Sequence, residues 1–191
     1  MPKIIGISGI GGSGKSTLTK ALSKKLNATA LYWDDFDEIS ESPSDYVKWY
    51  ETSKNYNDWK YDALADVLKK LKSGEKVICP ATKKELLPTD YVIFDAPLGR
   101  KHKTTGQYID YCIFLDTPLD IALARRLLRN YRDKNNLNIA DILLELDFYL
   151  ASSRPLYEMD YQNKDQFDLI ADGSLSTEKQ VELILKLLSA F

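Results

Sequence analysis

The sequence predicts an α/β fold in which a parallel sheet of about five strands is flanked by helices. Three observations predict it. Short apolar runs alternate with runs of helical spacing, the apolar runs lack the polar alternation of half-exposed strands, and a glycine-rich loop joins the first strand to the first helix. No repeat, linker or low-complexity stretch interrupts the pattern, so we expect one domain over residues 1–191.

Five apolar runs supply the predicted strands. Each is short, and polar or turn-forming residues lie at its ends, as in the strands of a doubly covered sheet. A small hairpin is also predicted, in which 77–79 pairs with 85–87 around a turn that begins at Pro80. In chain order the predicted strands of the main sheet are 3–8, 29–33, 91–95, 111–116 and 168–171.

Six runs of helical spacing lie between and after these strands. Pro43 stands at the predicted first position of the second helix and Pro118 opens the fourth, where a missing N–H is tolerated. Gly74 ends the third helix, and 177–180 resembles a capping box before the last. The predicted helices cover 15–26, about 43–53, 61–71, 118–127, 139–150 and 177–188.

Composition and charge exclude several classes of protein. Hydrophobic residues make up 44% of the chain and charged residues 28%, as in an ordinary folded protein. The net charge of −2 provides no basic field for nucleic acid, and no run approaches the ~20 apolar residues of a membrane span. Met1 leads directly into the first strand and Cys79 and Cys112 form no C-x-x-C pair, so we expect no signal peptide and reduced cysteines in a cytoplasmic protein.

The glycine-rich loop matches the phosphate-binding pattern G-x-x-x-x-G-K-S/T between a strand and a helix. Its glycines let backbone N–H groups surround a polyphosphate, Lys15 reaches the β- and γ-phosphates, and Ser16 offers a hydroxyl to Mg²⁺. A glycine turn before an ordinary helix is the alternative. The pattern predicts a P-loop NTPase fold that binds ATP or GTP with magnesium, through Gly9, Gly11, Gly12, Ser13, Gly14, Lys15, Ser16 and Thr17.

Two acidic sites follow predicted strands, at the sheet edge where ligands of such folds bind. Asp34 follows the second strand and Asp95 ends the third, in the position of a Walker-B acid. One acid would orient Mg²⁺, and the other would accept a proton from an attacking hydroxyl. For Asp34 and its acidic neighbours, a solvated turn or helix cap is an equally good interpretation.

These residues resemble the uridine kinase, phosphoribulokinase and nicotinamide riboside kinase group over nearly the whole chain. The similar segments are 6–17, the D-x-F turn at 34–36 and the arginine-rich run 125–133. The resemblance implies a small-molecule kinase that uses ATP and Mg²⁺, with Asp34 as the catalytic base and Asp95 near the metal. It also implies that the arginine-rich run is a lid, which we place at about 125–138.

Within the lid, Arg125, Arg129 and Arg132 share one helical face, and guanidinium groups there would clamp the transferring phosphate. A solvated basic face at a helix end is the alternative. We select Arg126 and Arg129 as catalytic residues, because they match the R-R-x-x-R-D pattern of the group. Asn130 departs from that pattern, which has Asp at this position.

The acceptor side matches the group less well, since 79–84 lacks its nucleoside-binding residues. We select Asp58, Arg100 and His102 as substrate-binding candidates, the last two because the donor-rich segment 97–106 follows the strand that ends at Asp95. The alternatives are a helix cap for Asp58 and an ordinary surface-loop histidine for His102.

The sequence therefore predicts a kinase that moves the γ-phosphoryl group of ATP to a hydroxyl of a small molecule, with a nucleoside as the first choice. A nucleotide-binding regulator or switch ATPase without an acceptor is the alternative. The GTPase version is disfavoured because 163–166 misses the last position of the base-reading N-K-x-D motif. The acceptor, ATP against GTP preference and oligomeric state stay open.

Overall fold

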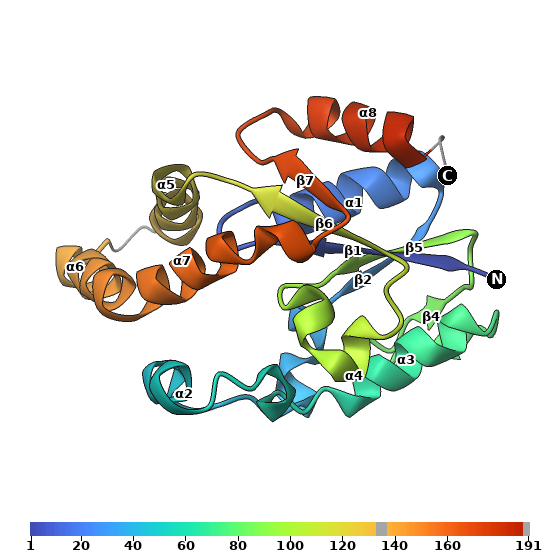
Figure 1. Cartoon of the computed structure of the whole chain (residues 1–191), viewed down its shortest axis with the longest axis horizontal. Helices are drawn as coiled ribbons and strands as arrows, with labels where there is room; N and C mark the ends of the chain where they lie inside the picture. The colour runs from blue at the N-terminus through green and yellow to red at the C-terminus, as the bar shows by residue number, and fades with distance from the viewer. Residues whose placement is uncertain (133–136, 189–191) are drawn as a thin grey trace.

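The structure is a computed structural model that describes residues 1–132 and 137–188 (Figure 1). Of the predicted lid, about 125–138, the structure describes 125–132 and 137–138. Residues 133–136 of the lid lie outside the described part. No helix in the described ranges has the length and apolar composition that a membrane span requires. Cys79 and Cys112 are both buried free thiols.

A five-stranded parallel sheet forms the centre of the fold, as the sequence predicts. The strand that leads into the glycine-rich loop lies in the middle, so the loop emerges between neighbours on both sides. Asp95 pairs in register with Ile7, which places this carboxylate beside the start of the loop. The spatial order is β2 (Thr29–Tyr32), β5 (Tyr91–Asp95), β1 (Lys3–Ser8), β6 (Tyr111–Asp116) and β7 (Leu169–Asp172).

Helices cover both faces of the sheet, and each face has its own apolar core (Figure 1). On one face, Ile5 and Ile7 pack with α1 (Lys15–Leu26) and α8 (Thr177–Leu188). On the other, Ile4 packs with α3 (Asp62–Lys72), and α4 (Lys103–Gly106) lies next to α3. Side chains of successive strand residues point to opposite faces, which is why Ile4 and Ile5 belong to different cores.

Most of the remaining elements gather at the end of the sheet to which the strands point, and they include the 3₁₀ turns η1, η2, η3 and η5 (Figure 1). The hairpin of β3 and β4 lies near the opposite end, where the strands begin, and pairs Val77 with Leu86, as predicted. Their bounds are η1 (Asp34–Ile39), α2 (Tyr46–Thr52), η2 (Tyr56–Asp58), β3 (Val77–Ile78), β4 (Glu85–Leu86), η3 (Gly99–Lys101), α5 (Leu119–Tyr131), α6 (Ile139–Phe148), α7 (Arg154–Gln162) and η5 (Lys164–Gln166).

Two helix starts differ from the prediction because another side chain makes the cap. The second helix begins at Tyr46, since the Asp45 carboxylate accepts a hydrogen bond from the Lys48 backbone N–H at 2.9 Å, and Pro43 lies outside the helix. At the last helix, Ser176 accepts from the Lys179 N–H at 3.4 Å, so the cap is one residue earlier than predicted.

The fifth predicted helix does not end before Pro155. A π-helical segment, η4 (Tyr149–Ser153), joins α6 to α7 without a break, and Pro155 lies in the first turn of α7. Proline has no backbone N–H to donate to the preceding helical turn. In a π-helical turn the hydrogen bonds join residues five apart instead of four, so the set of N–H groups that must donate differs from that of an uninterrupted α-helix. One long curved rod of three helical segments therefore runs along the end of the sheet.

Candidate active site

The loop between β1 and α1 has a backbone that only glycine accommodates at its critical positions. Gly14 caps α1 with a φ of 105°, and Gly12 has a φ of 87°. A Cβ atom on Gly12 would lie 2.2 Å from the Ala122 carbonyl oxygen, and one on Gly11 would lie 2.6 Å from the Tyr157 hydroxyl. The loop is thus held tightly between α5 and α7, with its open side free for a ligand.

Ser16 and Asp95 form a pair at the base of this loop. The Ser16 hydroxyl donates to Asp95 Oδ2 at 2.6 Å, and Asp95 is only 4% exposed. Burial raises the pKa of Asp95, while the charge of Lys15 and the hydrogen bond from Ser16 act in the opposite direction. A hydroxyl and a carboxylate at this spacing beside a phosphate loop are oxygen donors of the kind that Mg²⁺ takes, with phosphate oxygens and water completing its shell.

Lys15 lies over the loop, where its Nζ donates to the Ile10 carbonyl at 3.0 Å. Burial lowers the pKa of Lys15, and the carboxylates of Asp95, Asp34 and Asp160 oppose that shift. These carboxylates come from three different elements. The charges of all three act on the pKa of one ammonium group, and a lysine with a perturbed pKa in a cleft is a candidate functional residue.

A cleft of about 860 Å³ opens over the loop. Seven of the eight predicted loop residues line it, together with Asp34, Asp95, Arg126 and Arg129. The exception is Ser13, which is buried and whose carbonyl accepts hydrogen bonds from Thr117 at 3.0 Å and Arg125 at 3.1 Å. A cleft of this size suits a nucleotide-sized ligand.

The α5 arginines occupy three different environments. Arg126 lines the cleft and is held by Glu145, with Nε to Oε1 at 2.9 Å, and by the Tyr157 hydroxyl at 3.4 Å. Arg129 is exposed on the cleft wall. Arg125, which we did not select from the sequence, also lines the cleft and donates to the carbonyls of Ser13 and Gly173, at 3.1 and 3.0 Å.

Aromatic side chains that were not among the selected site residues form one wall of the cleft. Trp49 and Trp59 meet edge to face at 4.7 Å between ring centroids, and Tyr46 stacks on Trp59 at 6.0 Å. The density of aromatics between 46 and 61 was the available signal. The four aromatic residues on this wall are Tyr46, Trp49, Tyr56 and Trp59.

The structure places Asp58 outside the set of residues that line the cleft. Its carboxylate accepts hydrogen bonds from the Ser53 hydroxyl at 2.7 Å and the Asn55 side-chain amide at 3.0 Å. Both partners belong to the turn between α2 and η2. Asp58 therefore fixes a local turn, and its predicted contact with the substrate stays a prediction.

His102 is fully buried, and describing it as a surface-loop residue was wrong. Its Nδ1 lies 2.8 Å from the Thr105 hydroxyl and its Nε2 lies 2.9 Å from the Trp59 carbonyl. Burial lowers the pKa of His102, although the hydrogen bond to Trp59 acts against that shift. The neutral ring fastens η2, and hence the aromatic wall, to α4, so His102 acts on the cleft through Trp59.

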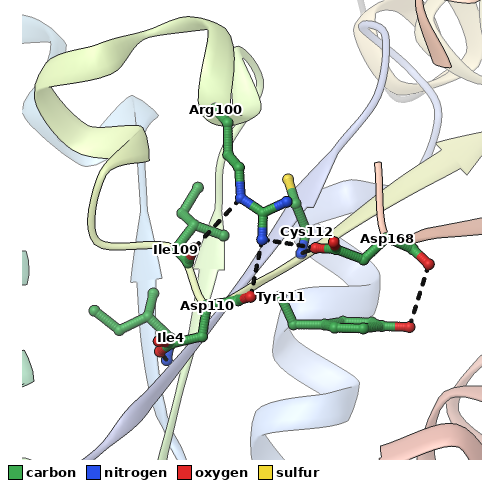
Figure 2. Close-up of polar contacts among 7 residues, drawn as sticks. All are labelled: Ile4, Arg100, Ile109, Asp110, Tyr111, Cys112 and Asp168. Carbon is green, nitrogen blue, oxygen red and sulfur yellow. Dashed lines mark hydrogen bonds and ion pairs between the residues drawn. The ribbon is translucent and has the colours of Figure 1, made fainter. Parts of the chain in front are cut away.

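Arg100 is a clamp at the edge of the sheet rather than a ligand of the cleft (Figure 2). Its Nη2 forms an ion pair with Asp168 at 2.7 Å and donates to the Asp110 carbonyl at 2.8 Å. Asp168 Oδ2 also accepts from the Cys112 backbone N–H at 2.7 Å. Arg100 thus ties the segment after β5 to the residues that directly precede β6 and β7.

Comparison with known proteins gives two kinds of match. The model of the AAA_18 family, described as an AAA domain, matches residues 5–143. A uridine kinase from Staphylococcus epidermidis is 28% identical to this chain over 197 aligned positions, which cover 95% of this chain and 92% of that protein.

Two solved structures show the same fold. Shikimate kinase from Acinetobacter baumannii superposes with a TM-score of 0.58 at 16% identity, covering 100% of this chain and 94% of that one. Deoxyadenosine kinase from M. mycoides superposes with a TM-score of 0.52 at 20% identity, covering 98% and 100%. The sheet, the loop and the helical rod are therefore those of a known fold.

Proposed function

The chain belongs to the AAA_18 family of AAA domains and is a P-loop kinase, and we propose that it transfers the γ-phosphoryl group of ATP to a hydroxyl of a nucleoside-like acceptor. The observation that carries this proposal is that one cleft contains the phosphate loop, Lys15, Asp34 and the α5 arginines together. The names of the matched uridine kinases support a nucleoside as the acceptor class.

In the proposed reaction, the acceptor hydroxyl attacks the γ-phosphorus while Asp34 accepts its proton. The new oxygen–phosphorus bond forms as the bond between the γ-phosphorus and the bridging oxygen breaks, and ADP leaves. Lys15, Arg126 and Arg129 stabilise the charge that spreads over the phosphate oxygens. Asp34 is suited to this role because it is exposed to the cleft and lies near enough to affect Lys15.

Ser16 and Asp95 would hold Mg²⁺, which supplies charge neutralisation for the phosphates when it is bound. The backbone of residues 9–14 would surround the phosphates, and Thr17 would close the loop at the first turn of α1. The α5–α6 region, about 125–138, would act as a lid whose arginines approach the phosphates as it closes. We propose that all these parts belong to a single domain.

The test is acceptor-dependent ADP release with Mg-ATP across nucleosides, ribosides, sugars and vitamin alcohols, with the product mass measured. We expect one acceptor class to gain 80 mass units, the mass of a transferred phosphoryl group, and to stimulate ADP release, with both effects lost in Asp34→Asn. ATP binding with no stimulation by any acceptor would contradict the proposal and favour a nucleotide-dependent regulator.

A further inference from the structure

A second, smaller cavity of about 310 Å³ adjoins the main cleft. The two cavities share Asp34, so the smaller one begins at the proposed catalytic base. We call it the side pocket. Its shared lining with the cleft also includes Tyr46, Trp59, Pro97 and Leu98. An acceptor lying in the side pocket would therefore present its hydroxyl to Asp34 at the boundary with the phosphate site.

The walls of the side pocket are flat aromatic surfaces. Trp33 and Tyr61 lie 4.0 Å apart between ring centroids with planes tilted by 31°, and both are at most 5% exposed. Trp59 and Tyr46 complete the aromatic lining. The buried pair Trp33 and Tyr61 forms a rigid base, and a flat ring on the ligand would gain most of its contact area from Tyr46 and Trp59.

Asp37 is the second carboxylate of the side pocket, after Asp34. The Tyr61 hydroxyl donates to Asp37 Oδ1 at 2.6 Å. Within the described part of the chain, Oδ2 has no hydrogen-bond partner, so it is available to a ligand. Burial raises the pKa of Asp37, the hydrogen bond from Tyr61 opposes that shift, and the nearby Asp34 carboxylate adds to it.

The charges around the side pocket have one sign. Among the described residues that line it, there is no lysine, arginine or histidine, and both ionisable acids are Asp. A carboxylate or phosphate ester placed there would meet two carboxylates and no cation on the pocket's own lining, since Lys15 and the α5 arginines lie on the phosphate side of Asp34. We expect this like-charge contact to lower its affinity. A neutral or positively charged group that donates hydrogen bonds would be favoured.

We propose that the side pocket is the acceptor subsite and that Asp37, held in place by Tyr61, determines specificity by accepting a hydrogen bond from a hydroxyl or amino group of the acceptor. The acceptor is then an uncharged or cationic hydroxyl compound with a flat ring, and carboxylates and phosphate esters are rejected. This inference rests on the proposed kinase function and narrows it to one chemical class.

The test compares acceptors and variants under the same Mg-ATP concentration. The acceptor panel contains uridine, deoxyadenosine and nicotinamide riboside, with shikimate as the anion. We expect the best ring-bearing acceptor to exceed shikimate by at least about 100-fold in kcat/KM, the range that buried polar recognition supplies.

Asp37→Asn keeps the shape of the side chain and removes its charge. We expect it to raise the KM for the best acceptor about 10- to 100-fold, while the KM for ATP changes less than about twofold. Tyr61→Phe keeps the ring and removes the tether, and we expect a smaller rise in the same KM. Asp35→Asn is the matched control, because Asp35 is an exposed carboxylate in the same turn that lines neither cavity.

Three outcomes would overturn the inference while leaving a kinase in place. They are a preference for shikimate, an unchanged acceptor KM in Asp37→Asn, and an equal effect of Asp35→Asn. If no acceptor is phosphorylated, the proposed function and this inference fall together. Thermal unfolding of each variant distinguishes a change in recognition from a change in folding.

Discussion

The phosphate side and the acceptor side of the cleft are built in different ways. On the phosphate side, short hydrogen bonds join consecutive residues to fixed partners, such as Ser16 to Asp95 at 2.6 Å and Lys15 to the Ile10 carbonyl at 3.0 Å. On the acceptor side, rings from α2, η2 and the end of β2 pack on one another, as Trp49 does on Trp59. A backbone cradle recognises what all nucleotides share, whereas packed side chains recognise one acceptor class.

The comparison has a physical basis in chain connectivity. Phosphate binding uses backbone N–H groups of adjacent residues, so the whole device fits in one short segment. The proposed acceptor site uses side chains that come together only when 33–61 and 97–102 fold against each other. The two sides are therefore expected to respond differently to substitution.

The largest effect is expected at Lys15. Lys15→Met removes the ammonium group at the phosphate loop, and kcat/KM should fall about 1,000-fold, as for other charge-stabilising groups in active sites. ADP release under saturating acceptor measures the loss. Lys20→Met, on the exposed side of the same helix, is the control and should change kcat/KM less than twofold. If Lys15→Met lowered kcat/KM only slightly, the proposed role of Lys15 in stabilising the charge on the phosphate oxygens would be contradicted.

Asp34→Asn should lower kcat about 100-fold, the lower range for the loss of a general base. ATP affinity should stay within about threefold of the parent, because Asp34 lies at the boundary of the two sides and not in the phosphate loop. We therefore expect slow turnover together with nearly unchanged ATP binding in this variant. Loss of ATP binding would instead place Asp34 on the phosphate side.

Arg125→Lys should raise the KM for ATP about tenfold with a smaller change in kcat. Nη1 of Arg125 donates to both the Ser13 and the Gly173 carbonyls, and lysine places its Nζ at the end of a shorter, more flexible side chain, which does not hold a donor at the same point. Initial rates against ATP concentration measure the change. Arg154→Lys is the matched control, because Arg154 is exposed and does not line the cleft, and an equal effect there would contradict a specific role for Arg125.

The smallest effect on turnover, and a distinct effect on stability, is expected at His102. His102→Gln should lower the free energy of unfolding by about 1–3 kcal/mol, because buried partners at Thr105 and Trp59 lose a well-placed bond. Chemical denaturation measures it. The acceptor KM should rise only a few-fold, through displacement of Trp59. A variant with full stability would show that the ring does not fasten the wall.

The same histidine gives stability a pH dependence with a defined sign. Its pKa is lowered in the folded state, so the unfolded chain binds the proton more readily. The His102 contribution is fully present above the unfolded pKa of about 6.5 and is lost as pH falls below it. Parent and His102→Gln should therefore differ in unfolding free energy more at pH 7.5 than at pH 5.5, and a difference that is equal at both would contradict this.

Much of the phosphate side was predictable from sequence and most of the acceptor side was not. Residues 9–17 apart from Ser13, together with Asp34 and Asp95, line one cleft, because the loop is a contiguous motif and a parallel sheet brings the ends of its strands together. Their catalytic roles stay predictions. Arg100 and His102 follow the strand of Asp95 in the chain, yet their side chains turn away to Asp168 and to Trp59.

Sequence distance along a loop carries no information on which way its side chains turn, and that is why the sequence did not show that Asp58, Arg100 and His102 lie outside the lining of the cleft. Their partners lie in other segments or in a turn whose shape depends on tertiary packing. The strands and most helices were recovered because apolar periodicity is a local property. The helix caps at Asp45 and Ser176 differ by a few residues, since neighbouring polar side chains compete for the same N–H groups.

The π-helical segment 149–153 determines which side chains of the following helix, α7, face the cleft. A turn that holds an extra residue rotates the following helix by about 100° relative to an uninterrupted one. Tyr157 meets the phosphate loop at Gly11, and Asp160 lies on the cleft wall, in the phase that this extra residue sets. In a relative that lacks the extra residue, different positions of α7 would face the cleft. A sequence alignment without a gap in this segment would therefore pair residues that face the cleft in one protein with residues that face away from it in the other.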